Sequence, residues 1–318
     1  GRKEFIDAFE EIIRQLPPAN NRLFLDGVWG DGKTSVLNLL EKRFLKEEKE
    51  KIPFRRINPW HNDTKEKFLK ALLFEINDFC QSGKNRFSLD TAPFLSLNSI
   101  SLGVFSFTTS QSEDNIGNLI NDLSEKLKIK TEKRVFIIDD LDRLSRSHIL
   151  DILSVIYMFS ECPNLIFLMS GDITKIEKIL TEEGENCGEN KKNRKQYSYY
   201  SGYIDKIATN IIKLPAPHPY FIRDFFIKRL ESIEKEKNIK FLKGNNLDKN
   251  FPNLNFKNLR EAKKILVGFK NSFFQEKVQT EVDPFQFLLV SILLVSFPEF
   301  YYKIFQNERF WTADLYNK

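Results

Sequence analysis

Short apolar runs alternate with helical patterns along residues 20–214. The apolar runs lie at residues 22–26, 53–58, 134–139, 164–170 and 210–214. Between them, apolar residues recur at helical spacing near 33–50, 62–82, 115–128, 147–160 and 173–183. An alternation of this kind is typical of α/β proteins, in which a parallel sheet is flanked by helices. We therefore expect an α/β core whose sheet has five parallel strands.

The regions on either side of this alternation are helical in pattern. The pattern predicts an amphipathic helix over residues 1–16, and Pro17 and Pro18 are expected to end it. From Pro215 onward the apolar residues recur only at helical spacing. Two apolar stripes there consist of Ile222, Phe225, Phe226, Leu230 and Ile233, and of Leu259, Ala262, Leu266 and Phe269. The pattern thus predicts a core over 1–214 followed by a helical lid, or subdomain, over 215–318.

Two insertions interrupt the core. Residues 83–113 include a Ser-rich stretch, 97–109, with many β-branched and aromatic side chains. This stretch fits either a hairpin packed beside the sheet or an exposed ribbon that binds a partner. Residues 184–202 are polar, basic and rich in Gly and Asn, which predicts a mobile loop.

Composition narrows the class of protein. With 41% hydrophobic and 29% charged residues, the chain is typical of a soluble globular protein rather than a disordered one. The apolar run at 285–297 is shorter than the roughly 20 residues of a membrane span, so we expect a buried helix and no transmembrane segment. The 3 cysteines lie far apart and suggest neither a disulfide framework nor a zinc site, which favours a cytoplasmic protein.

The most informative stretch is GVWGDGKTS, residues 27–35, which separates the first strand from the next helix. It fits the G-x-x-x-x-G-K-[ST] phosphate-loop motif, in the strand–loop–helix context that the motif requires. Backbone amides and the helix N-terminus attract a triphosphate. Lys33 is expected to contact the β and γ phosphates, and the Thr34 hydroxyl to bind Mg²⁺. The predicted nucleotide contacts comprise Gly27, Trp29, Gly30, Asp31, Gly32, Lys33, Thr34 and Ser35.

A second motif supplies the carboxylates that hydrolysis needs. Residues 135–138 form an apolar run that ends in Asp139 and Asp140, where a parallel strand reaches the ligand-binding edge of its sheet. We expect Asp139 to hold Mg²⁺ through water, and Asp140 to orient or deprotonate the attacking water. The following strand ends in Ser170 and Asp172, where a polar side chain either contacts that water or simply ends the strand.

Charge on the transferred phosphoryl group also needs a cation, and three arginines are candidates. Arg143 follows the two carboxylates closely, so it either projects toward the nucleotide of a neighbouring subunit or pairs with an acidic side chain. Arg194 belongs to the basic insertion. Arg260, beside Leu259 of the second apolar stripe, either reaches back to the phosphates or is a solvated surface residue.

Together these residues resemble the KAP family of P-loop NTPases. The resemblance rests on GVWGDGKTS with Trp29, on INPWHND with Asn58 and Trp60, and on FIIDDLDRL with its Asp-Asp-Leu-Asp-Arg run at 139–143. It covers about residues 3–308 and includes the looser matches YIDKIATNIIKLP and FPEFYYKIF. Because Trp29 lies inside the loop, nearer the γ phosphate than adenine, we expect its ring to pack against protein rather than stack on the base.

The resemblance implies an additional-strand ATPase core, related to the STAND and AAA+ classes, that acts as a nucleotide-controlled switch or scaffold. Bacterial members resemble or accompany phage-exclusion and other defence proteins. In such a core we expect the 53–58 strand to be displaced, so that the strands bearing the phosphate loop and Asp139 are neighbours. Some members carry transmembrane helices between the two nucleotide motifs, whereas the 83–113 insertion is too polar for that.

ATP is the expected nucleotide, because the nearest match to a guanine-specific Asn-Lys-x-Asp motif, residues 190–193, has no aspartate. We expect an ATPase, slow by itself, that works as a homo-oligomer or with an effector protein. The alternative is a nucleic-acid-directed ATPase in which basic residues 191–195 contact phosphates, although a net charge of +5 is mild for a nucleic-acid binder. A phosphotransferase is a third option, but no acceptor motif is visible.

Overall fold

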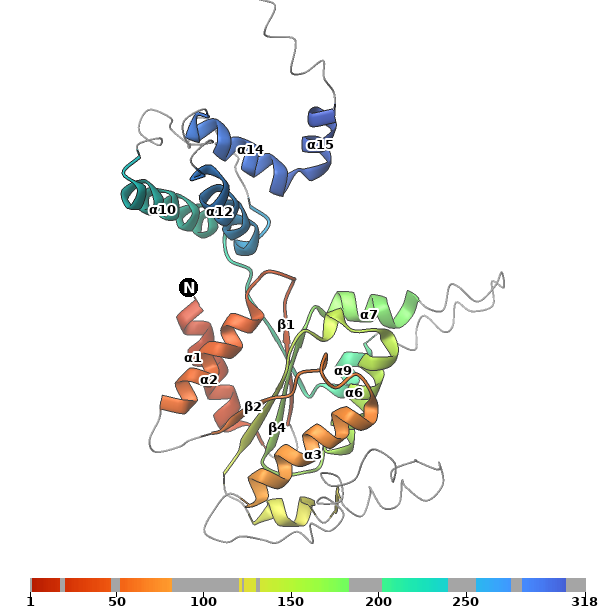
Figure 1. Cartoon of the computed structure of the whole chain (residues 1–318). Coiled ribbons are helices and arrows are strands. Elements are labelled where there is room, and N and C mark those ends of the chain that lie inside the picture. The colour runs from red at the N-terminus through yellow and green to blue at the C-terminus, as the bar shows by residue number, and fades with distance from the viewer. Residues whose placement is uncertain are drawn as a thin grey trace, which may run out of the picture. The chain divides into compact units, whose positions relative to one another are not determined.

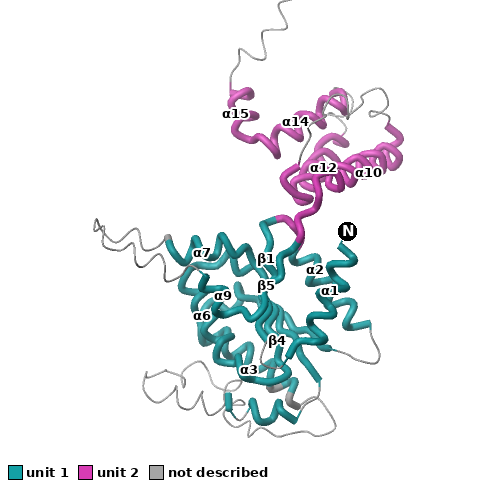
Figure 2. Tube along the Cα trace, turned by 180° about the vertical axis from the view of Figure 1, so that it is seen from behind, with its two compact units in different colours: residues 1–29, 33–214 teal, residues 30–32, 215–318 magenta. Residues whose placement is uncertain are grey.

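The computed structural model describes most of the chain (Figure 1). The described residues are 2–17, 21–46, 52–81, 120–121, 123–129, 132–182, 202–239, 256–275 and 282–306. The insertion at 83–113 lies outside them, as does the insertion at 184–202 except for Gly202. The chain divides into two compact units (Figure 2), one made of residues 1–29 and 33–214 and the other of residues 30–32 and 215–318.

The first unit contains a five-stranded parallel sheet, as the alternating pattern predicts. Its strands are β1 (Arg22–Asp26), β2 (Phe54–Arg56), β3 (Arg134–Ile138), β4 (Leu165–Gly171) and β5 (Asn210–Lys213). Their order across the sheet is β2-β3-β4-β1-β5. The register pairs Leu25 with Ser170 and Ile138 with Met169, so three strands end together at one edge.

This order corrects one expectation about the sheet. The strand near 53–58 is displaced to an edge beside β3, as expected, but β1 and β3 are not neighbours, because β4 lies between them. All seven residues of β4 are buried, which suits a central strand covered on both faces. The inserted strand is therefore 165–171, which follows the Asp139 strand in the sequence.

Charged side chains line the short edge strand β2. Arg55 Nε lies 3.1 Å from a carboxylate oxygen of Glu75. Arg56 contacts Glu41 at 3.0 Å and donates to the Asn38 side chain at 2.6 Å. Because charged residues make a sheet edge a poor template for another strand, this arrangement is typical of an edge position.

Helices cover both faces of the sheet (Figure 1). One face packs against α1 (Arg2–Gln15) and α2 (Lys33–Lys46), and the other against α3 (Lys65–Gln81), α6 (Arg146–Met158), α7 (Ile173–Glu182) and α9 (Tyr203–Ile207). Successive residues of a strand point to opposite faces of the sheet. Leu23 and Leu25 therefore pack in the core beneath α1 and α2, while Phe24 packs in the core on the other face. Residues 120–121 and 123–128 are also helical, within the range predicted near 115–128.

The second unit is helical in its described part. It consists of α10 (Pro219–Lys237), α12 (Leu259–Phe273), α14 (Pro284–Ser296) and α15 (Pro298–Gln306). Its core includes Phe226, Leu230, Phe269 and Leu288. Among the described residues no single helix is long and apolar enough to cross a membrane, although α14 and α15 pass that test together and are bent by 117° where they meet.

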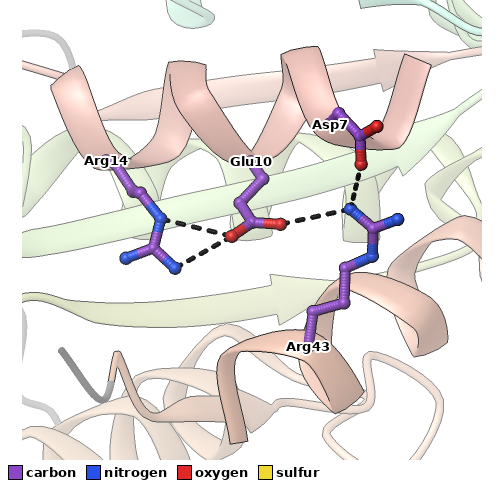
Figure 3. A network of polar contacts seen from close by, with 4 residues as sticks. All are labelled: Asp7, Glu10, Arg14 and Arg43. Carbon is purple, nitrogen blue, oxygen red and sulfur yellow. Dashed lines mark hydrogen bonds and ion pairs between the residues drawn. The ribbon is translucent and has the colours of Figure 1, made fainter. Parts of the chain in front are cut away.

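An ionic network joins α1 to α2, the helix that follows the phosphate loop (Figure 3). Glu10 accepts hydrogen bonds from Arg14 at 2.9 Å and from Arg43 at 3.3 Å, and Arg43 also contacts Asp7. Lys133, just before β3, donates to the carbonyl oxygen of Arg14 at 2.6 Å near the end of α1. The network thus ties α1 both to α2 and to the sheet.

The Glu10 network makes a prediction about stability. Burial by itself would raise the pKa of Glu10, but the hydrogen bonds from Arg14 and Arg43 outweigh it and lower that pKa overall. We expect Glu10→Gln to reduce the free energy of unfolding at pH 7, because it removes the charge that accepts hydrogen bonds from both arginines. The loss should be only about 1 kcal/mol, because solvent screens the two partly exposed arginines. This loss of stability should be complete above about pH 4.3, the pKa of a glutamate in the unfolded chain. It should vanish as the pH falls through the lower pKa of Glu10 in the folded protein.

Urea unfolding of both proteins between pH 3 and 7 measures this difference. Glu11→Gln is the control, because Glu11 lies on the exposed side of the same helix and accepts a hydrogen bond from the Gln15 side chain. Its effect should stay within about 0.5 kcal/mol. An equal loss in both variants would contradict a role for the network.

Candidate nucleotide site

The phosphate loop joins the end of β1 to the start of α2. Gly27 N donates to Gly171 O at 3.1 Å, which fixes the first residue of the loop to the end of β4. Gly30 and Gly32 have φ of +96° and +90°, in the left-handed region where a side chain would be strained. These two glycines let the chain reverse and begin α2 at Lys33, so the helix N-terminus follows the loop directly.

Lys33 folds back over this loop. Its side chain is buried, and its Nζ donates to the carbonyl oxygens of Gly27 at 2.6 Å and Val28 at 3.4 Å. An ammonium group held against a glycine-rich loop at a helix N-terminus suits an anion, because a phosphate oxygen is a stronger acceptor than a neutral carbonyl. The loop therefore fits the phosphates of a nucleotide.

Asp139 is the centre of the polar contacts at the sheet edge. Its Oδ2 accepts a hydrogen bond from Thr34 Oγ1 at 2.8 Å. Its Oδ1 accepts from the Asp140 N–H at 2.9 Å and from the Ser170 hydroxyl. Hydroxyl groups from the start of α2 and the end of β4 therefore converge on the carboxylate that follows β3.

These oxygen atoms also fit a magnesium ion. Thr34 and Asp139 offer a hydroxyl and a carboxylate, which are hard oxygen ligands of the kind that Mg²⁺ prefers. No group of three or more His, Cys, Asp or Glu side chains among the described residues could hold a metal. A site with so few protein ligands matches the usual pattern for Mg²⁺, which takes its other ligands from phosphates and water.

Asp140 occupies an unusual position beside this centre. Its backbone is left-handed, with φ of 61°, and it precedes the short 3₁₀ helix η1 (Leu141–Arg143). Arg143 Nη2 lies 3.1 Å from its Oδ1. Burial and the charge of Asp139 raise the pKa of Asp140, while Arg143 opposes the rise. A raised pKa makes this carboxylate a better proton acceptor than an ordinary aspartate.

The other predicted site residues lie in different surroundings, and one of them is outside the described residues. Arg143 pairs with Asp140 in this chain, which corresponds to the acidic partner that we considered for it. Trp29 is 45% exposed, and Ser35 is exposed on α2. Arg260 is the second residue of α12 in the second unit, so its role toward the phosphates stays a prediction. Arg194 lies outside the described residues.

The turn after β2 shows a contact that the sequence pattern did not reveal. Asn58 Oδ1 accepts from the Trp60 N–H at 2.9 Å, and the Asn62 side chain donates to the Asn58 carbonyl at 2.9 Å. A ring nitrogen of His148, on α6, lies 2.9 Å from the Asn62 carbonyl oxygen. The Asn-x-Trp element is thus a compact turn fastened to the helix that follows η1.

Comparison with known proteins identifies the family. The model of the KAP family P-loop domain matches residues 2–272. The chain belongs to the KAP family of P-loop NTPases. This KAP chain therefore has the nucleotide-binding domain of its family, as its motifs predict. No curated protein sequence matches it significantly.

Several solved structures match the KAP chain at low sequence identity. The Walker-type ATPase PABY2304 of Pyrococcus abyssi is 14% identical, with a TM-score of 0.39, and the match covers 94% of this chain and 69% of that one. The Aeropyrum pernix Orc1 protein, solved in complex with DNA, is 12% identical, with a TM-score of 0.45 and coverages of 91% and 64%. Domain III of DnaA from Thermotoga maritima is 17% identical, with a TM-score of 0.42 and coverages of 91% and 90%.

The position of Lys33 makes a prediction about nucleotide binding. We expect Lys33→Ala to weaken ATP binding roughly 100-fold or more, because it removes a charged donor to the phosphates. Titration calorimetry measures the affinity, and a melting curve shows whether the variant is folded. Lys42→Ala, which removes an exposed lysine from the same helix, is the control and should bind ATP like the wild type. Equal affinity in the two variants would contradict the assignment of the phosphate loop.

Proposed function

We propose that this KAP chain binds ATP with Mg²⁺ and hydrolyses it as a nucleotide-controlled regulatory module. The observation that carries the proposal is the set of contacts around Asp139, which brings together Thr34 of the phosphate loop and Ser170 of the central strand. Asp140 follows directly and has a raised pKa. The groups to which we assign phosphate binding, metal binding and proton transfer therefore lie at one edge of the sheet.

Each group has a separate role in the proposed reaction. The loop amides and Lys33 hold the phosphates, and Ser170 fixes the orientation of the Asp139 carboxylate. When bound by Thr34 and Asp139, Mg²⁺ would neutralise charge on the phosphate oxygens. Asp140 orients a water molecule and accepts its proton as the water attacks the γ phosphate. Arg143 restrains the Asp140 side chain and favours its ionised form.

The same arrangement supports slow hydrolysis by a single chain. A cation on the γ phosphate speeds transfer by about 10³ to 10⁵. Arg143 is held by Asp140, and a role of Arg260 toward the phosphates stays a prediction. We propose that a second copy of this chain or an effector protein supplies such a cation. Assembly would then control turnover, which is the behaviour of a switch.

Two further parts of the proposal rest on the sequence. ATP is favoured over GTP because residues 190–193 lack the aspartate of a guanine-specific motif. A role in bacterial anti-phage defence rests on the resemblance to KAP proteins alone. The nucleic-acid-directed alternative depends on residues 191–195, which lie outside the described residues, and it is not proposed.

Turnover at increasing protein concentration tests the proposed function. We expect ATP hydrolysis that depends on Mg²⁺, with a rate per chain that rises with concentration as oligomers form. Phosphate release and light scattering, measured on the same samples, follow the rate and the size. Asp140→Asn is the control, because it should bind ATP normally while its turnover falls by roughly 10² to 10⁴. A flat rate per chain from a monomer would contradict the assembly switch, and no turnover at any concentration would contradict the ATPase.

Mixing two inactive variants tests the position of Arg143. Since Arg143 contacts Asp140 of its own chain, Arg143→Ala and Asp140→Asn damage the same half of the same site. We expect the mixture to be no more active than the average of the two variants measured alone. Recovery of activity in mixed oligomers would instead show that Arg143 acts on the nucleotide of a neighbouring subunit.

A further inference from the structure

A buried carboxylate lies beneath the candidate site and has no role in the chemistry proposed above. Asp142, in η1, is 1% exposed, and neither of its carboxylate oxygens has a hydrogen-bond partner. The Lys175 ammonium lies 3.7 Å from its Oδ2. At this distance the two groups form an ionic contact, but they are too far apart for a direct hydrogen bond. The Lys175 side chain is 49% exposed, so its charge remains hydrated.

Such a group is costly to keep for stability alone. A buried carboxylate without hydrogen bonds loses its hydration, and few protein contacts compensate for that loss. A protein with a neutral side chain of similar shape at such a position is often as stable as the original or more stable. Costly buried charges of this kind gather at functional sites. The question is therefore what the Asp142 charge does for its neighbours.

Asp142 and Lys175 connect two elements that flank the site. Asp142 belongs to the turn that begins with Asp140, while Lys175 is in the first turn of α7, just after β4. The turn packs against α7 and also against the end of β4, where a Cβ atom placed on Gly171 would lie only 3.4 Å from the Asp142 backbone nitrogen. The start of α7 is in turn fixed to β1, because Ile173 N donates to Asp26 at 3.0 Å.

The turn itself has few bonds of its own. Its two backbone hydrogen bonds, Arg143 N to Asp140 O and Leu144 N to Leu141 O, are both long at 3.2 Å. Asp140 adopts the left-handed conformation, which aspartate tolerates better than most residues but which still favours a position held by its surroundings. Besides its contacts with Asp139 and Arg143, an attachment of the turn to a neighbouring element would help to keep Asp140 in place.

We propose that Asp142 is a positioning residue for Asp140, and that its ionic contact with Lys175 holds the turn against α7. The proposal rests on the proposed function, because it assigns a task to Asp140. Asp142 does not touch substrate in it. The buried charge draws the Lys175 end of α7 toward the turn, and the turn then presents Asp140 beside Asp139.

Substitutions at the two positions test this role. Asp142→Asn and Lys175→Ala should each lower kcat by roughly 10- to 100-fold, as expected for a small misplacement of a reacting group, with ATP affinity unchanged. Lys175→Arg keeps the charge and should retain most of the activity. Asp142→Asn should also melt at the same temperature as the wild type or higher, because it removes a buried charge whose desolvation cost no hydrogen bond offsets. Lys178→Ala, further along α7, is the control and should behave like the wild type.

Amide hydrogen exchange gives a second measurement that does not depend on hydrolysis. The Arg143 and Leu144 amides should exchange at least about tenfold faster in Lys175→Ala than in Lys178→Ala. If the wild type showed no turnover, the proposed function would fail, and this comparison would still decide whether Lys175 holds the turn. Unchanged exchange would overturn the proposal, as would a lower melting temperature of Asp142→Asn with unchanged kcat, which would indicate a purely structural role.

Discussion

The candidate site depends on one carboxylate being held from two sides. Asp139 accepts from Thr34, at the start of the helix after β1, and from Ser170, at the end of β4. The Ser170 contact exists because β4 lies beside β3, so that a polar side chain from the middle strand reaches the acid on its neighbour. Strand order, more than any single residue, therefore determines how the phosphate loop and the metal-binding acid face each other.

Much of this arrangement was predictable from the sequence, for a simple physical reason. A strand that is buried on both faces must be apolar throughout, so β3 and β4 appear as continuous runs whose ends match within one residue or two. The phosphate loop was equally clear, because Gly30 and Gly32 take backbone angles that favour glycine. The family match then confirmed the resemblance that these motifs indicate.

Strand neighbours and buried charges were harder to predict. Parallel strands are joined by crossover connections that contain a helix and can skip a position in the sheet. Order along the chain therefore does not determine order in the sheet, and the adjacency expected for β1 and β3 was wrong. Asp142 posed a similar problem. In the sequence it is one of three acidic residues within four positions, and only in the folded chain, where its turn packs against β4 and α7, is it buried while Asp140 stays partly exposed.

The arginines on β2 limit how copies of this protein can join. Arg55 and Arg56 lie on the outermost strand and bind acidic side chains of α3 and α2, the helices on opposite faces of the sheet. A neighbouring chain that extended the sheet at this edge would bring its strand beside both ion pairs, and charged side chains make an edge a poor template for such pairing. The edge at β2 therefore favours oligomers that form through helices and loops over a continuous intermolecular sheet.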